Sequence, residues 1–161
     1  MTGGPHDVER LYRSHGPLVL RRARALLGSE ADAHEVLQDV FAALVRDPAR
    51  LNGVRSVVAW LYQATTHHCL NLLRDRRTGA RLLERHARPG SPPVVAGGEV
   101  AAEVRSLLAL LPEEEAAALV YHHLDGMTYA EVAELLGCSQ RKVGYLLERA
   151  QGLLQREETS A

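Results

Sequence analysis

The chain has 161 residues, of which 46% are hydrophobic and 24% charged, enough apolar material for one ordinary domain or two small helical ones. No stretch approaches 18 consecutive apolar residues, and residues 1–6 lack a basic or apolar signal region, so we expect no membrane insertion and a cytoplasmic protein. Cys69 and Cys138 lie far apart without a metal-type or redox-type spacing, which favours reduced thiols packed as small apolar side chains.

The composition predicts an all-α fold, because aromatic residues make up only 4% of the chain and Ala, Leu, Val and Arg dominate. Charge is unevenly distributed: residues 1–77 carry eleven basic and eight acidic side chains, whereas residues 101–161 carry five basic and ten acidic ones. Between them, Pro89–Pro93 and Gly97–Gly98 cannot hold a regular helix. We therefore predict two small helical domains, 1–77 and 101–161, joined by a flexible linker over 78–100; whether the domains dock together stays open.

Two helices are predicted before residue 48. Pro17 is expected at the start of the first, because proline suits the first turn of a helix, and Gly28 ends it. The second begins around residues 29–32 and stops before Pro48. Its apolar residues recur at helical spacing: Ala33, Val36, Leu37, Val40, Phe41 and Leu44.

The other face of this second helix carries an acidic row, formed by Asp32, Glu35 and Asp39. Such a row is either a solvated surface or a binding site for a basic partner. The charges alone favour the solvated surface.

A long helix is predicted after the loop at residues 48–56. Its apolar residues also have helical spacing: Val58, Leu61, Tyr62, Thr65, Cys69, Leu72 and Leu73. The opposite face carries flat, hydrogen-bonding and basic side chains: Trp60, Gln63, His67, Asn71, Arg74, Arg76 and Arg77. Such a face can stack on bases and hold phosphates. Alternatively, Trp60 is a core residue and the arginines only cap the helix C-terminus.

The second domain contains a helix-turn-helix pattern. Two helices over about residues 99–124 come first. Thr128 and Glu131 then form a capping box, Gly137 permits a tight turn, and Ser139 caps a last helix. This order predicts a pair of helices of the kind that enters the major groove of DNA.

Motifs in both halves carry a resemblance to a known family. They are Leu26-Leu27-Gly28, Asp32-Ala33, Val36-Leu37-Gln38-Asp39-Val40-Phe41 and Trp60-Leu61-Tyr62 with Asn71, Leu73 and Arg74, then Leu111-Pro112-Glu113, Leu124-Asp125-Gly126-Met127-Thr128-Tyr129, Glu131-Val132-Ala133, Leu136-Gly137 and Val143. In type, order and separation they resemble the bacterial RNA polymerase sigma factors of the extracytoplasmic-function (ECF) group in the sigma-70 family. The resemblance covers roughly residues 8–77 and 101–154.

The resemblance implies a transcription initiation factor that binds core RNA polymerase and promoter DNA, with an anti-sigma factor as a further candidate partner. Core polymerase contacts are implied for Asp32, Glu35, Gln38 and Asp39. Capture of the melted downstream promoter element is implied for Asn52, Arg55, Trp60, Gln63, His67, Asn71, Arg74, Arg76 and Arg77. Reading of the upstream element is implied for Ser139, Gln140, Arg141, Lys142, Tyr145 and Arg149.

Other functions were weighed against this one. The sequence has no glycine-rich phosphate loop, nucleophile elbow or evident carboxylate pair, so we expect no enzymatic activity. Neighbouring histidines at 67–68 and 122–123 point apart on a helix, so we expect no metal site and no cofactor. A sigma-like DNA- or protein-binding regulator that does not initiate transcription stays open, because the second domain is acidic.

Overall fold

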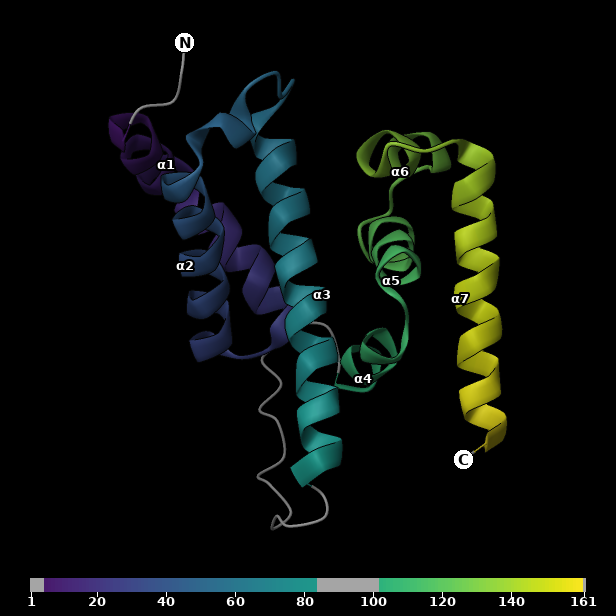
Figure 1. Cartoon of the computed structure of the whole chain (residues 1–161). Helices are drawn as coiled ribbons and strands as arrows, with labels where there is room; N and C mark the ends of the chain where they lie inside the picture. The colour runs from purple at the N-terminus through teal and green to yellow at the C-terminus, as the bar shows by residue number, and fades with distance from the viewer. Residues whose placement is uncertain (1–4, 84–101, 161) are drawn as a thin grey trace.

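The computed structural model describes residues 5–83 and 102–160, which form helices and turns and contain no strand. The elements are α1 (Pro5–Leu27), α2 (Glu30–Arg46), the 3₁₀ turn η1 (Pro48–Leu51), α3 (Val57–Leu83), α4 (Ala102–Leu110), α5 (Glu113–Leu119), the π-helical turn η2 (Val120–Leu124), α6 (Tyr129–Leu136) and α7 (Gln140–Ser160). Helices α1, α2 and α3 form one bundle; α4 packs mainly on α3, and α5, α6 and α7 pack on one another in a second unit beside α3 (Figure 1). The all-α prediction is confirmed.

Helix α1 begins earlier than predicted. It starts at Pro5 and holds Pro17 in its interior, where we expected a first turn. Pro17 lacks the N–H that would bond the Arg13 carbonyl, which ordinarily weakens a helix. Val8 and Val19, one on each side of this break, are both buried in the core. Packing of the whole apolar face against the bundle therefore outweighs the local cost of the proline.

Helix α2 has the predicted start, stop and apolar face. The Ser29 hydroxyl accepts a hydrogen bond from the Asp32 N–H (3.3 Å), which satisfies one exposed donor of the first turn. The helix ends at Arg46, and Pro48 opens the turn η1. All six apolar residues that were predicted to face the core are buried.

Helix α3 is covered on two sides. It contacts α1 and α2 on one side and α4 and α5 on the other (Figure 1). Leu61 and Cys69 of the predicted apolar face are fully buried, but Val58 is 46% exposed, and Thr66 and Leu70 are buried outside that face. A single apolar stripe underestimates the burial of α3, because the second unit adds a second covered face.

The helix also runs past the expected linker boundary. It continues to Leu83, although the segment from Gly79 was predicted to be irregular. One glycine costs a helix only about 1 kcal/mol, so Gly79 alone does not end it. The residues that carried the linker prediction, Pro89–Pro93 and Gly97–Gly98, lie outside the described residues.

The helix-turn-helix prediction is confirmed in its local chemistry. Thr128 accepts from the Glu131 N–H (3.2 Å) while Glu131 accepts from the Thr128 N–H (3.1 Å), the reciprocal bonds of a capping box. Gly137 closes α6 with a φ of +66°, the left-handed region that favours glycine. Ser139 then accepts from the Lys142 N–H (3.0 Å) at the start of α7.

Replacing Thr128 with alanine is expected to destabilise the second unit by about 1 kcal/mol, because the first turn of α6 loses a capping partner. Urea denaturation followed by circular dichroism measures the change. Thr159→Ala is the matched control, since the Thr159 hydroxyl bonds back to the Gln155 and Arg156 carbonyls in the exposed C-terminal end of α7. Equal effects of the two substitutions would contradict a capping role for Thr128.

Candidate polymerase and nucleic-acid interface

The exposed face of α2 carries three of the four residues implied in polymerase binding. Glu35, Gln38 and Asp39 are solvent-exposed, while their neighbours Val36 and Leu37 are buried. The spacing of three and four residues aligns the three side chains along one side of the helix. This face is therefore free to meet a basic partner.

Asp32 does not share that exposure. It is 6% exposed, and both of its carboxylate oxygens accept hydrogen bonds from the Arg76 guanidinium of α3. The structure thus corrects the expected acidic row, which begins at Glu35. The Arg76 side chain stays 54% exposed, so the pair lies at the edge of the bundle, where it ties the start of α2 to the C-terminal half of α3.

The residues expected to capture unpaired bases lie along α3 and the loop before it. Asn52 and Arg55 are exposed in that loop. Trp60 is partly buried and packs against the hydrophobic core, so it combines an apolar anchor with an accessible edge. Further along the helix, Asn71 and Arg74 are half-buried, as is Arg77.

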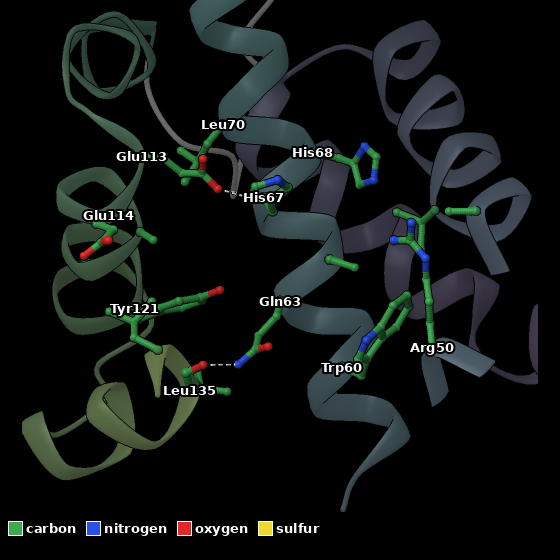
Figure 2. A pocket seen from close by; sticks show the side chains of 15 residues that line it. Arg50, Trp60, Gln63, His67, His68, Leu70, Glu113, Glu114, Tyr121 and Leu135 are labelled. Atoms are coloured by element: carbon green, nitrogen blue, oxygen red, sulfur yellow. Dashed lines mark hydrogen bonds and ion pairs between the residues drawn. The ribbon is translucent and has the colours of Figure 1, made fainter. Parts of the chain in front are cut away.

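Two residues in the middle of this row are bound by the second unit. The Gln63 amide donates to the Leu135 carbonyl of α6, and His67 pairs with Glu113 of α5. Figure 2 shows both side chains pointing from α3 toward the second unit. A cavity of about 370 Å³ lies between the two units around these contacts, lined in part by Trp60. The second unit therefore engages the middle of the row that was expected to contact DNA, although His67 stays exposed.

Arg22 of α1 is the central polar residue of the contact between the units. Its guanidinium donates to both carboxylate oxygens of Asp125 (2.6 and 2.9 Å) and to the Thr66 hydroxyl (3.1 Å). It also lies 4.1 Å from the ring centroid of Tyr62, which stacks on Tyr121 of the second unit. Burial, with a hydrogen bond to Asp125, raises the pKa of Tyr62 well above its usual value, so the phenol stays protonated.

Sequence reasoning missed this cluster. Arg22 belongs to none of the motifs above, and Asp125 belongs only to the run Leu124-Asp125-Gly126-Met127-Thr128-Tyr129. One signal was available: Arg22 lies four residues before Leu26, which is buried, so it occupies the core-facing side of α1. An arginine at such a position calls for an acidic partner, but 103 residues separate it from Asp125 and nothing local identifies the pair.

The recognition helix α7 presents the expected side chains to solvent. All six residues implied in upstream reading are exposed: Ser139, Gln140, Arg141, Lys142, Tyr145 and Arg149. Two of the cations pair with acids of α5, Lys142 with Glu114 (3.1 Å) and Arg149 with Glu115 (3.4 Å). The bond to Glu114 raises the pKa of Lys142, which stays charged. Part of the positive charge of α7 is thus neutralised within the unit.

His68 lies next to the row expected to contact DNA and faces away from the second unit (Figure 2). It is half-buried, with Asp39 and Arg50 as its charged neighbours besides His67. Burial is the main cause that lowers the pKa of His68, and the adjacent His67 adds to it. The folded protein therefore holds His68 neutral more readily than the unfolded chain does.

Folding stability is expected to fall as the pH drops below about 6.5, the usual histidine value in an unfolded chain. There the unfolded state binds the proton that folded His68 resists, so protonation favours unfolding, with a slope of at most about 1.4 kcal/mol per pH unit for this group. Urea midpoints at pH 7.5 and 5.5 measure the effect. The loss should shrink in His68→Gln and persist in His34→Gln, which changes an exposed histidine; an unchanged slope in His68→Gln would contradict this assignment.

Neither a membrane span nor a metal centre is found in the described part of the chain. None of its helices has both the length and the apolarity that crossing a bilayer needs. No three of its His, Cys, Asp or Glu residues are grouped so that they could hold a metal ion. His122 instead donates from Nδ1 to the Met127 carbonyl (2.7 Å) at the turn before α6.

Two family models match separate parts of the chain. The family model for sigma-70 region 2 matches residues 11–78, and that for sigma-70 region 4 matches residues 101–151. The ECF RNA polymerase sigma factor SigM of Mycobacterium tuberculosis is 28% identical, over 97% of this chain and 79% of SigM.

Two solved structures share the fold. CnrH, in complex with the cytosolic domain of CnrY, aligns with a TM-score of 0.54 and 25% identity over 98% of this chain and 91% of CnrH. The RNA polymerase sigma factor CnrH of Cupriavidus metallidurans is also among the similar sequences. The sigma factor RpoE of Bartonella quintana, in complex with the anti-sigma factor NepR, aligns with a TM-score of 0.54 and 17% identity over 93% of this chain and 95% of RpoE.

A helical bundle that matches region 2, followed by a helix-turn-helix unit that matches region 4, defines a sigma factor. The chain belongs to the sigma-70 family, and within it to the ECF group. It is a transcription initiation factor that works with core RNA polymerase and promoter DNA.

Proposed function

We propose that this sigma factor binds core RNA polymerase through the exposed face of α2. The observation that carries this assignment is the alignment of Glu35, Gln38 and Asp39 in solvent, opposite the buried stripe of the same helix. Carboxylates on a rigid helix suit a basic partner surface, because they give both long-range attraction and register. Asp32 is left out of this surface, since it is buried and paired with Arg76.

We propose further that the N-terminal region, residues 1–77, opens and holds the downstream promoter element. Trp60, Gln63 and His67 offer flat or hydrogen-bonding groups that suit unstacked bases, and the loop residues Asn52 and Arg55 lie exposed beside them. Asn71 belongs to the same base-capturing face, and phosphate contacts are assigned to the three arginines at the end of the row: Arg74, Arg76 and Arg77.

The C-terminal region, residues 101–161, is proposed to read the upstream element with the first turns of α7. Exposed Gln140 and Arg141 stand at its N-terminus, where the helix-turn-helix arrangement places base-contacting residues. Residues 78–100 join the two regions in this scheme. The protein is proposed to act in the cytoplasm and to perform no bond chemistry of its own.

An anti-sigma factor is proposed as a regulatory partner. CnrH and RpoE, which share this fold, form complexes with the cytosolic domain of CnrY and with the anti-sigma factor NepR. An anti-sigma factor for this chain would have to compete with polymerase or promoter DNA for the surfaces described above.

A regulator that does not initiate transcription is the second candidate function. The observation in its favour is that two cations of α7, Lys142 and Arg149, are paired with Glu114 and Glu115. Few unpaired cations on α7 mean little counterion release on binding DNA.

Size-exclusion chromatography with bacterial core RNA polymerase separates the two functions. An initiation factor co-elutes with the polymerase and supports initiation from promoters that the complex selects from a random-sequence library. A stand-alone regulator fails to co-elute and binds duplex DNA unaided, a result that would contradict the proposed function.

A further inference from the structure

We propose that a cavity between α3 and α4 is a binding site for a small-molecule oligophosphate, such as a nucleoside triphosphate. The cavity has a volume of about 430 Å³, which lies within the range of small-ligand pockets. It is located where α4 packs beside the C-terminal half of α3 (Figure 1). Binding of such an anion goes beyond the proposed function and needs neither polymerase nor promoter DNA.

Three guanidinium groups line this cavity, and they come from two helices. Arg76 and Arg77 belong to α3, while α4 contributes Arg105 and the neighbouring Ser106. No acidic residue of the described part of the chain is among the lining residues. Planar guanidinium groups bind phosphate oxygens through paired N–H bonds, and several of them around one hollow suit a ligand with several negative charges. The lining therefore indicates an oligophosphate.

The Arg105 side chain is held in position by the fold. It is only 7% exposed, and its guanidinium lies against Gly28 at the turn between α1 and α2, where a Cβ would displace it. Gly28 also has a φ of +65°, in the left-handed region that favours glycine. An arginine confined in this way loses little side-chain freedom when a ligand binds, which lowers the entropic cost of binding.

The charges around the cavity leave it positive. Asp32 accepts hydrogen bonds from two nitrogens of Arg76 and offsets that one charge. No acid within the ranges that the structure describes forms an ion pair with Arg77. Asp75 and Glu103, the exposed acids nearest in sequence, do not line the cavity. An anion that enters therefore meets positive charge that the protein has not neutralised.

The remaining lining is apolar and favours a compact ligand. It is formed by two leucines and two alanines: Leu73, Ala102, Ala109 and Leu110. A cavity that combines guanidinium groups with leucines suits a ligand that joins phosphates to a flat or apolar group, as a nucleotide does. A DNA or RNA strand would instead call for cations that follow an extended backbone.

Two residues are shared between this site and the proposed promoter contacts. Arg76 and Arg77 are assigned to phosphates of the downstream element, so a bound oligophosphate would compete with promoter DNA for them. That consequence rests on the proposed function, whereas binding of the anion does not.

Isothermal titration calorimetry of the full-length chain with GTP, without Mg²⁺ and at about 0.15 M salt, tests the site. We expect saturable binding of one GTP per chain. Ser106→Glu adds a negative charge at the cavity and Arg77→Gln removes a cation, and both leave Arg105 in place. Each should raise the Kd about tenfold, as expected for the loss of one charge-assisted hydrogen bond. Ser14→Glu and Arg21→Gln make the same changes at exposed residues of α1 and should keep the wild-type Kd.

Two further titrants identify the chemistry that is recognised. Inorganic tripolyphosphate carries the phosphates without the nucleoside. Weaker binding of tripolyphosphate than of GTP would assign the site to nucleotides, and equal binding would assign it to inorganic polyphosphate; either result supports an oligophosphate site. Citrate, which carries carboxylates instead, should bind more weakly than both, and citrate binding as tight as that of tripolyphosphate would overturn the preference for phosphate.

Other outcomes would overturn the site itself. They are the absence of saturable GTP binding, a Kd in Ser106→Glu and Arg77→Gln equal to that of their controls, and a loss of helicity in both variants, because the residues would then serve folding. A fluorescein-labelled (dT)20 strand whose binding responds to Ser106→Glu, while GTP binding does not, would assign the cavity to a nucleic-acid strand instead. None of these measurements involves polymerase, so they leave the proposed function standing, and failure to co-elute with polymerase would leave the anion site standing.

Discussion

Replacing Glu35 and Asp39 together with arginine is expected to abolish binding to core RNA polymerase while the helical content stays unchanged. Both side chains are exposed on α2, four residues apart, on the side opposite Val36 and Val40 of the core. The double reversal converts two attractive contacts into repulsive ones, and like charges brought together at an interface cost several kcal/mol. A loss of at least about 100-fold in affinity follows, since each 1.4 kcal/mol is a factor of ten.

Size-exclusion chromatography with core polymerase and far-ultraviolet circular dichroism measure the two quantities. The matched control is the double reversal Glu9→Arg with Asp47→Arg, two exposed acids of the same bundle outside this face. It should co-elute like the wild type. Co-elution of the Glu35 and Asp39 variant, or loss of its helix signal, would contradict the assignment of polymerase binding to this face of α2.

The elements that could be predicted from the sequence are those set by local chemistry. Ser29 starts α2, and Thr128 with Glu131 starts α6, because each cap is formed by residues within three positions. The apolar stripe of α2 also follows from helical spacing alone, since only one side of that helix meets the bundle. Helix starts and buried helix faces can therefore be predicted where the contacting residues lie within one or two helical turns of each other.

The features that could not be predicted depend on distant partners. Asp32 was expected in the exposed row, but Arg76 lies 44 residues away and holds it inside the bundle. Gln63 was expected to face solvent, yet it bonds the second unit across 72 residues. Burial of α3 on two faces follows from the docking of the second unit, which spacing within α3 cannot show.

The charge around the recognition helix α7 likewise depends both on composition and on distant partners. The acidic composition of residues 101–161 predicts weak attraction to DNA. The structure shows where that charge acts: Glu114 and Glu115 of α5 lie against Lys142 and Arg149 of α7. Upstream reading by α7 must therefore rely more on polar contacts with base edges than on phosphate attraction.

Replacing Trp60 with alanine is expected to impair promoter opening far more than polymerase binding. Trp60 is partly buried at the start of α3 and borders the cavity between α3 and the second unit, next to the proposed base-capturing surface. A stacked base contributes about 1–3 kcal/mol, so its loss should reduce open-complex formation by roughly 5- to 150-fold. The proposed polymerase contacts lie on α2, so the affinity for polymerase should change by less than about twofold.

Permanganate reactivity of unpaired thymines on a promoter selected by the wild-type holoenzyme measures opening, and co-elution measures polymerase binding. Val58→Ala is the matched control, because Val58 lies in the same turn of α3, is 46% exposed and offers no surface for stacking. It should leave both quantities near the wild-type values. Equal loss of opening and of polymerase binding in Trp60→Ala, or a reduced helix signal, would instead show that the indole acts as a core residue, because it also packs against the hydrophobic cluster of the bundle.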